Sequence, residues 1–173
     1  IAQRFNSDFN AVDFLKVPEP LIQKNFSRIM SLKNATKKMS KSDPSDLSRI
    51  NLTDDSDLIV SKIKKAKTDS KPMPSIEENL EKRPEAENLL GIYSSLSNQN
   101  LEKSKKEFEG KNFSEFKEKL SDLLIDKISP ISDEIKKLLN DKKYLDDILL
   151  EGSEKANEIA YKKIKEMKKL IGF

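Results

Sequence analysis

Apolar residues recur every three or four positions through most of the second half of the chain, which is the spacing of an amphipathic α-helix. The first such segment, "DDSDLIVSKIKKAKTD", places Ile59, Ile63 and Ala66 on one face. Acids gather at its start and lysines at its end, as the helix dipole favours. The next segment, "PEAENLLGIYSSLS", has Pro84 just inside its start, where proline is well tolerated. Its inner face comprises Ala86, Leu89, Leu90, Tyr93 and Leu96.

Further helical segments follow. Asn100 can cap a helix over "LEKSKKEFEG", and Gly110 can end it. The segment "NFSEFKEKLSDLLIDKI" repeats apolar residues at helical spacing, and because Pro130 follows we expect a separate helix over "ISDEIKKLLN". The last segment is long. Its apolar stripe consists of Leu145, Ile148, Leu149, Gly152, Ala156, Ile159, Ala160, Met167 and Leu170, and its small members would let a neighbouring helix come close.

The first 50 residues lack this periodicity. The opening "IAQRFN" resembles the tail of a helix, and because the chain begins at Ile1 we expect it to be a piece of a larger protein. Pro18 and Pro20 interrupt regular structure. The short apolar run from Phe26 to Leu32, "FSRIMSL", favours a buried strand over one turn of helix. The pattern therefore predicts a mainly α chain: a strand and a long loop at the edge of a missing structure, then a bundle of about five or six helices.

Composition narrows the possible chemistry. The chain has 173 residues, of which 36% are charged, and its net charge of +3 is too small to indicate a polyanionic partner. Without Cys or His, it lacks disulfides, thiolate ligands, the commonest metal ligand and the commonest general base near neutral pH. No metal site is predicted. Four glycines exclude a glycine-rich phosphate loop.

No apolar run has the length of a membrane span and no signal peptide is visible, so a cytoplasmic location is expected.

Charge is distributed unevenly around "NATKKMSKSDPSDLSRIN". No acid occurs from Pro20 to Ser42, and acids resume directly afterwards. The basic residues in this interval are Lys24, Arg28, Lys33, Lys37, Lys38 and Lys41. Lys38 and Lys41 are three residues apart and, with the hydroxyls of Ser40 and Ser42, could wrap a polyphosphate. The alternative is a solvated basic loop, because short Lys/Ser stretches are common.

The string "KMSKS", Lys38 to Ser42, resembles the second signature of class I aminoacyl-tRNA synthetases. The wider "RIMSLKNATKKMSKSDPSDLSRINLTDD" is similar to this loop in the bacterial tryptophanyl-tRNA synthetases. The tyrosyl relatives usually carry a variant of it. The resemblance covers nearly the whole chain, because "VSKIKKAKTDS", "RPEAENLLGIYSSLS", "FEGKNFSEFKEKLSDLLIDKISPI" and "LLEGSEKANEIA" resemble the family's C-terminal helical region.

This resemblance implies two regions. Residues 1–53 would be the C-terminal part of a Rossmann catalytic domain, including the KMSKS loop, and residues 54–173 the helical region that receives the anticodon end of tRNA. The implied reaction joins L-tryptophan to ATP, with Mg²⁺ accompanying the nucleotide, to give tryptophanyl-adenylate and pyrophosphate. Tryptophan then passes to tRNA-Trp. Family members are homodimers and are not membrane proteins.

The resemblance also implies a set of site residues. The ATP-binding positions are Ile29, Lys38, Met39, Ser40, Lys41 and Ser42. Lys38 and Lys41 would be catalytic by holding the ATP phosphates, whereas Met39 and Ile29 would lie near the adenine. The first class I signature, which contains histidine and glycine, is absent, as are the tryptophan-recognising residues. We therefore expect a C-terminal half that is inactive alone. The alternatives are a non-catalytic helical tRNA-binding module and a helical scaffold that makes no use of the loop.

Three other features have competing explanations, and no tRNA-binding residue is assigned. Two lysine clusters could contact the tRNA backbone or could follow the helix dipole; they comprise Lys62, Lys64, Lys65, Lys67 and Lys71, and Lys162, Lys163, Lys165, Lys168 and Lys169. Core packing is expected, rather than base stacking, for Tyr93, Phe108, Phe113 and Phe116. Helix capping is expected, rather than metal binding, for Asp54, Asp55 and Asp57.

Overall fold

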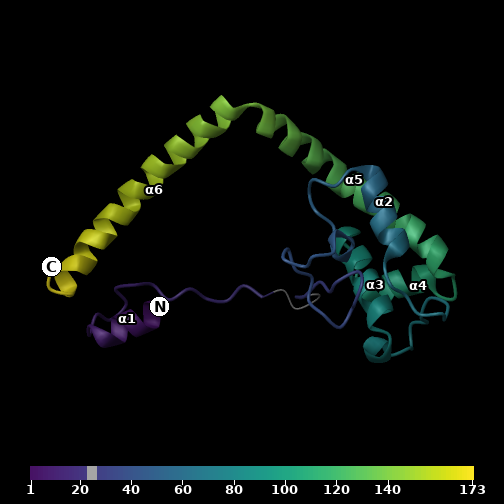
Figure 1. Cartoon of the computed structure of the whole chain (residues 1–173). Coiled ribbons are helices and arrows are strands. Elements are labelled where there is room, and N and C mark those ends of the chain that lie inside the picture. Colours follow the sequence, from purple (N-terminus) through teal and green to yellow (C-terminus); the bar gives the residue numbers. More distant parts are fainter. Residues whose placement is uncertain (23–26) are drawn as a thin grey trace. The chain divides into compact units, whose positions relative to one another are not determined.

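The computed structural model describes residues 1–22 and 27–173. Within these residues the chain forms α-helices and short 3-10 helices and no strand, which confirms the mainly α prediction (Figure 1). In chain order the elements are α1 (Ala2–Asp8), η1 (Asp46–Ser48), α2 (Ser56–Lys65), η2 (Leu80–Lys82), α3 (Pro84–Leu96), α4 (Leu101–Phe108), α5 (Phe113–Asn140) and α6 (Lys142–Leu170).

The chain divides into two compact units. One comprises Ile1–Ile22 with Leu138–Phe173, and the other, here called the helical unit, is Gln23–Lys137. This division follows spatial contacts and differs from the predicted boundary between residues 53 and 54. The functional division at that boundary stays a prediction.

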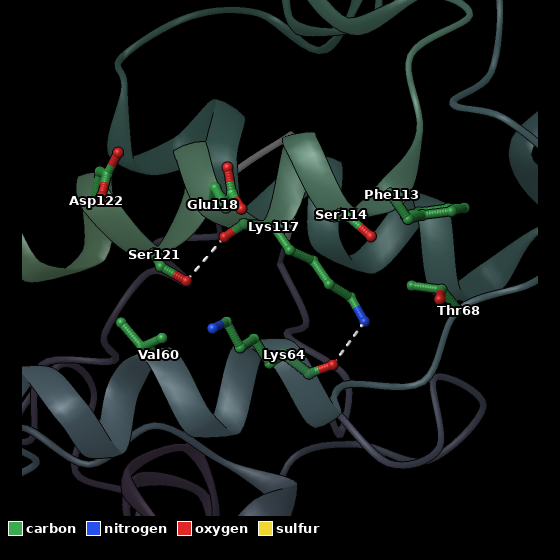
Figure 2. Close-up of a pocket in the computed structure, with 9 residues that line it drawn as sticks. All are labelled: Val60, Lys64, Thr68, Phe113, Ser114, Lys117, Glu118, Ser121 and Asp122. Carbon is green, nitrogen blue, oxygen red and sulfur yellow. Dashed lines mark hydrogen bonds between the residues drawn. The ribbon is translucent and has the colours of Figure 1, made fainter.

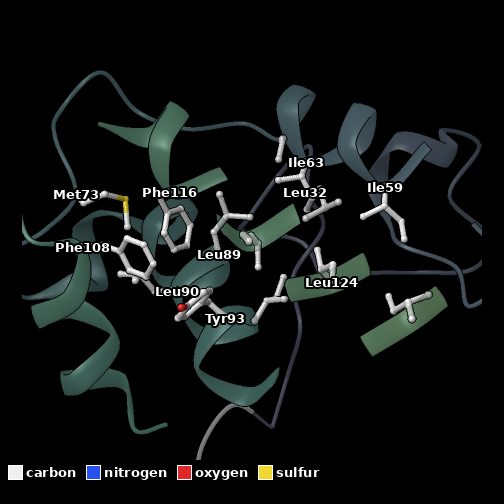
Figure 3. Close-up of a cluster of buried hydrophobic side chains, with 14 of the residues drawn as sticks. Leu32, Ile59, Ile63, Met73, Leu89, Leu90, Tyr93, Phe108, Phe116 and Leu124 are labelled. Carbon is white, nitrogen blue, oxygen red and sulfur yellow. The ribbon is translucent and has the colours of Figure 1, made fainter. Parts of the chain in front are cut away.

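The core of the helical unit contains the residues expected from the apolar pattern (Figure 3). Ile59 and Ile63 of α2 are fully buried, as is Phe116 of α5. The rings of Tyr93 and Phe108 lie edge to face with centroids 4.8 Å apart, and Phe108 and Phe116 repeat this arrangement at 4.8 Å. Such pairs contribute packing energy beyond their buried area. The prediction of core packing is therefore confirmed for these three aromatic residues, while Phe113 is only partly buried against the core.

The starts of two helices are capped by side chains, as predicted. The Oδ1 atom of Asn100 accepts a hydrogen bond from the amide of Lys103 at 2.8 Å. At the start of α2, Asp55 accepts from the amide of Leu58 at 2.8 Å. These bonds satisfy amides that have no partner within the helix. Asp54, which was grouped with Asp55 as a capping residue, instead lies buried and binds Lys62.

The prediction of a strand in "FSRIMSL" is wrong for residues 27–32, where a single isolated antiparallel bridge joins Met30 to Lys38. Phe26 and Lys24 lie outside the described residues. On the edge of Met30 that faces away from Lys38, the side chain of Asn88 makes the hydrogen bonds that a second strand would make in a sheet. The amide of Met30 donates to Asn88 Oδ1, and Asn88 Nδ2 donates to the Met30 carbonyl, both at 2.9 Å. The backbone of Met30 is thus satisfied without a sheet.

Helix α5 runs through Pro130, so the prediction of two separate helices is wrong. Proline lacks an amide hydrogen, which leaves the carbonyl four residues earlier without its helical donor. On either side of Pro130, however, Ile128 and Ser132 are buried. This packing favours a continuous helix despite the missing hydrogen bond.

Helix α6 forms over the predicted segment, but none of its residues is buried. A Cβ atom added at Gly152 would meet no atom within 4 Å inside its own unit, so the unit formed by Ile1–Ile22 and Leu138–Phe173 does not itself supply the expected close helical neighbour. Within the same unit, Lys163 Nζ lies 3.6 Å from the centroid of the Phe14 ring. Of the described helices, none combines the length and apolarity needed to span a bilayer.

Candidate functional site

The basic segment forms a loop whose two limbs run antiparallel; we call Lys37–Asp43 the lysine loop. The amide of Ser31 donates to the Lys37 carbonyl at 2.8 Å, and the amide of Met39 donates to the Ile29 carbonyl at 3.0 Å. Met39 is half-buried and packs against the core, whereas Ile29 is exposed. The two residues predicted to lie near an adenine are therefore brought together by a backbone hydrogen bond.

The loop places two hydroxyls side by side. The Oγ atoms of Ser40 and Ser42 lie 2.9 Å apart, and the Ser42 amide donates to Ser40 Oγ at 3.3 Å. Lys38 and Lys41 are exposed. Neither lysine takes part in an ion pair with any described residue. The loop thus presents cations and hydroxyls together at the surface, which are groups that bind phosphate oxygens.

The limb that leads into the lysine loop is attached to two helices of the helical unit. Asn88 of α3 holds the backbone of Met30, as described above. The amide of Lys67, just beyond α2, donates to the Leu32 carbonyl at 2.8 Å, and the amide of Leu32 donates to the Ser48 carbonyl at 2.9 Å. Sequence reasoning did not identify Asn88. The available signal was a buried-face amide within the apolar segment "ENLLGIYSS".

The limb that leaves the loop is attached through Lys62 of α2. This side chain is completely buried, and its Nζ atom lies 2.6 Å from Asp54 Oδ2 and 2.6 Å from Asp46 Oδ2. The hydrogen bond from Lys62, followed by one from Asn51, lowers the pKa of Asp46 below its ordinary value. Lys62 was grouped with possible tRNA-contacting lysines, but its burial excludes a surface contact. Its position three residues after Ile59, on the apolar face of α2, was the signal for burial.

A separate groove of about 390 Å³ lies between α2 and α5 and contains none of the predicted site residues (Figure 2). Within it, Lys117 Nζ donates to the carbonyls of Lys64 and Ala66 at 3.0 and 2.7 Å. Burial lowers the pKa of Lys117. Because this ammonium group covers carbonyls that end α2, its contacts are those of a helix cap.

Comparison with known proteins gives a consistent result. The family model described as "tRNA synthetases class I (W and Y)" matches residues 1–128. Over its whole length the chain is 47% identical to a tryptophan–tRNA ligase of Caulobacter vibrioides, and it covers 50% of that protein. It is 50% identical to a tryptophan–tRNA ligase of Rickettsia conorii, covering 52% of it. The crystal structure of tryptophanyl-tRNA synthetase from Mycoplasma pneumoniae matches with a TM-score of 0.83 and 25% identity, over 99% of this chain and 51% of that one. The chain thus spans about half the length of the curated relatives it matches.

Proposed function

The chain belongs to the class I tRNA synthetases for tryptophan and tyrosine, and we propose that it is the C-terminal half of a tryptophan–tRNA ligase. The names of the relatives support tryptophan, and their lengths support a missing half. The proposed full-length enzyme forms tryptophanyl-adenylate from tryptophan and ATP and transfers tryptophan to tRNA-Trp. As in the sequence-based division, residues 1–53 would complete the catalytic domain and residues 54–173 would receive the anticodon end of the tRNA. The enzyme would act in the cytoplasm as a homodimer.

In the proposed first step, a carboxylate oxygen of tryptophan attacks the α-phosphorus of ATP. The bond from that phosphorus to the bridging oxygen breaks, and pyrophosphate leaves with the electron pair. Lys38 and Lys41 would neutralise the charge that develops on the departing phosphates, while the hydroxyls of Ser40 and Ser42 would turn away from each other and donate hydrogen bonds to them. Ile29 and Met39 would bound the adenine. The exposure of both lysines beside the paired hydroxyls is the observation that carries this assignment.

Mg²⁺ would enter bound to the ATP phosphates and would neutralise further phosphate charge. The KMSKS motif itself supplies ammonium and hydroxyl groups, which bind phosphate oxygens rather than the cation. Among residues 1–22 and 27–173, no group of three or more acidic side chains that could hold a metal ion is found.

Replacing Lys41 tests this function in the full-length enzyme. Lys41→Ala is expected to lower ATP-dependent pyrophosphate exchange by ~10²-fold or more, because it removes a donor that acts on the developing charge. Tryptophan binding should change little. The matched control is Lys33→Ala, which removes an exposed lysine outside the motif. An unchanged kcat with weaker tryptophan binding alone would contradict the phosphate role.

A second candidate function is a non-catalytic helical module that binds tRNA. It is supported by the helical unit, which has a hydrophobic core of its own and exposes several lysines. The two candidates differ in the full-length protein, where a ligase loses pyrophosphate exchange in the Lys41→Ala variant and a non-catalytic module has no such exchange to lose.

A further inference from the structure

The downstream limb of the lysine loop ends at a cluster with one cation and two carboxylates. Lys62 is fully buried and Asp54 is 4% exposed, whereas the Asp46 side chain is 50% exposed. Asp54 has further donors, because it accepts from the backbone amide of Asn51 at 2.9 Å and from its Nδ2 atom at 3.1 Å. Lys62 and Asp54 therefore form a satisfied buried pair, and Asp46 is an additional carboxylate that the burial of Lys62 does not require.

The other oxygen of Asp46 binds two residues of the limb that leaves the lysine loop. Asp46 Oδ1 lies 3.0 Å from Arg49 Nη2 and accepts a hydrogen bond from Asn51 Nδ2 at 3.0 Å. Arg49 in turn donates from Nη1 to the Asp43 carbonyl at 3.0 Å. Asp43 directly follows Ser42, the last residue of the motif. A continuous series of charged contacts therefore runs from the buried cation of α2 to the backbone of the loop.

We propose that Asp46 is a positioning residue for ATP activation, which holds the lysine loop through Arg49 in the orientation that receives the ATP phosphates. This inference rests on the proposed function and concerns the same site. Asp46 uses one oxygen for Lys62 and the other for Arg49, so both cations are fixed by one carboxylate. Holding the loop before ATP arrives reduces the conformational freedom that is lost on binding.

An amide cannot replace this carboxylate. Asn presents one acceptor oxygen and an NH₂ group, which would face one of the two cations. The substitution Asp46→Asn therefore breaks the direct link from Lys62 to Arg49 with little change in side-chain size, and Arg49 keeps only its bond from Nε to Asn51 Oδ1 at 3.1 Å on this side. Because Lys62 keeps Asp54 as its partner, no buried charge is left unpaired. The second substitution, Arg49→Gln, removes the donor to the Asp43 carbonyl and leaves the contacts of Lys62 in place.

The test measures pyrophosphate exchange by the full-length enzyme, with ATP and tryptophan varied separately, together with the melting temperature. Asp46→Asn and Arg49→Gln are each expected to raise the KM for ATP about tenfold, a typical effect of losing a hydrogen bond to a charged group. The KM for tryptophan and the melting temperature should stay close to those of the unaltered enzyme. Asp57→Asn is the matched control, because Asp57 is an exposed carboxylate in the first turn of α2.

Each outcome decides the proposal. If both variants have the ATP KM of Asp57→Asn while Lys41→Ala lowers exchange, the positioning role is overturned and the proposed function stands. If the two substrate KM values rise together with a lower melting temperature, Asp46 is structural and the proposal is also overturned. If Lys41→Ala has no effect, the proposed function fails and this inference fails with it. Should Asp46→Asn not fold, the ATP KM of Arg49→Gln decides the question.

Discussion

At the scale of single residues, the ammonium group of Lys62 joins Asp46, the first residue of η1, to Asp54, which lies just before α2. Its two carboxylate partners, Asp54 and Asp46, differ in how much each needs this ammonium group to offset its charge. Asp54 is buried, so its ionised form relies on Lys62 and the Asn51 side chain and backbone. Asp46 is half-exposed and can be solvated by water when its partner is absent. Removing a cation from a buried pair leaves an uncompensated charge, which is the costly case for a buried ion pair.

We therefore expect Lys62→Met to lower the free energy of unfolding by about 3–5 kcal/mol. Methionine keeps most of the buried apolar volume but leaves Asp54 without its cation. Urea denaturation measures the change. Lys64→Met, at an exposed position of the same helix, is the control and should have little effect. Equal stabilities of the two variants would show that Asp54 is neutralised in another way.

The site was predictable from the sequence only where its residues are contiguous. The motif residues from Lys38 to Ser42 could be selected because they are neighbours in the chain. The roles of Asn88 and Lys62 could not be selected in this way, because each depends on a contact with a distant segment. Asn88 lies 58 positions from Met30 and binds the backbone of that residue. A contact with the backbone leaves no pattern among the side chains of the sequence.

At the scale of elements, α5 contains a proline in its interior and yet stays continuous. Pro130 is exposed, so its ring adds little to the core. Its main effect on the helix is the lost hydrogen bond and the steric conflict with the preceding turn. The helix therefore persists through its packing, and its local backbone is less stable than the flanking turns.

Pro130→Ala should raise the free energy of unfolding by up to about 3 kcal/mol, because alanine restores the missing amide donor and has the highest helix propensity. Thermal or urea unfolding measures the gain. Lys127→Ala, at another exposed position of α5, is the control for propensity alone and should have a much smaller effect. If Pro130→Ala destabilises the protein, the backbone conformation that proline favours there is needed by the fold.

Helix positions were predictable because periodicity, caps and Pro84 are local signals. The existence of α2, α3 and α4 and their buried faces agree with the apolar pattern. The errors arose where tertiary contacts outweighed local preference. Burial of Ile128 and Ser132 offset the effect of a proline, and an asparagine side chain replaced a strand next to Met30.

At the scale of the whole molecule, the lysine loop belongs to the helical unit and both of its limbs are attached to the helices of that unit. Asn88 and Lys67 hold the incoming limb, and Lys62 holds the outgoing limb. The helical unit could therefore support the loop without the remainder of the proposed enzyme. Catalysis needs more than this support, because the tryptophan site and the first class I signature are expected in the other half.

The isolated chain is expected to show no pyrophosphate exchange above that of its own Lys41→Ala variant, even at high ATP concentration. The reason is that one set of phosphate contacts cannot orient tryptophan for attack. The assay compares this chain, its variant and the full-length enzyme under one set of conditions. Activity in the isolated chain that Lys41→Ala removes would show that the chain holds a complete active site.

The contact between Asn88 and Met30 also bears on how this sequence can vary. Because Asn88 binds only the backbone of residue 30, the identity of that residue is not fixed by the contact. Position 88 has no such freedom. Aspartate would set an acceptor against the Met30 carbonyl, and a longer glutamine would shift both hydrogen bonds. Drift at residue 30 and constancy at residue 88 are thus the expected evolutionary record of this attachment.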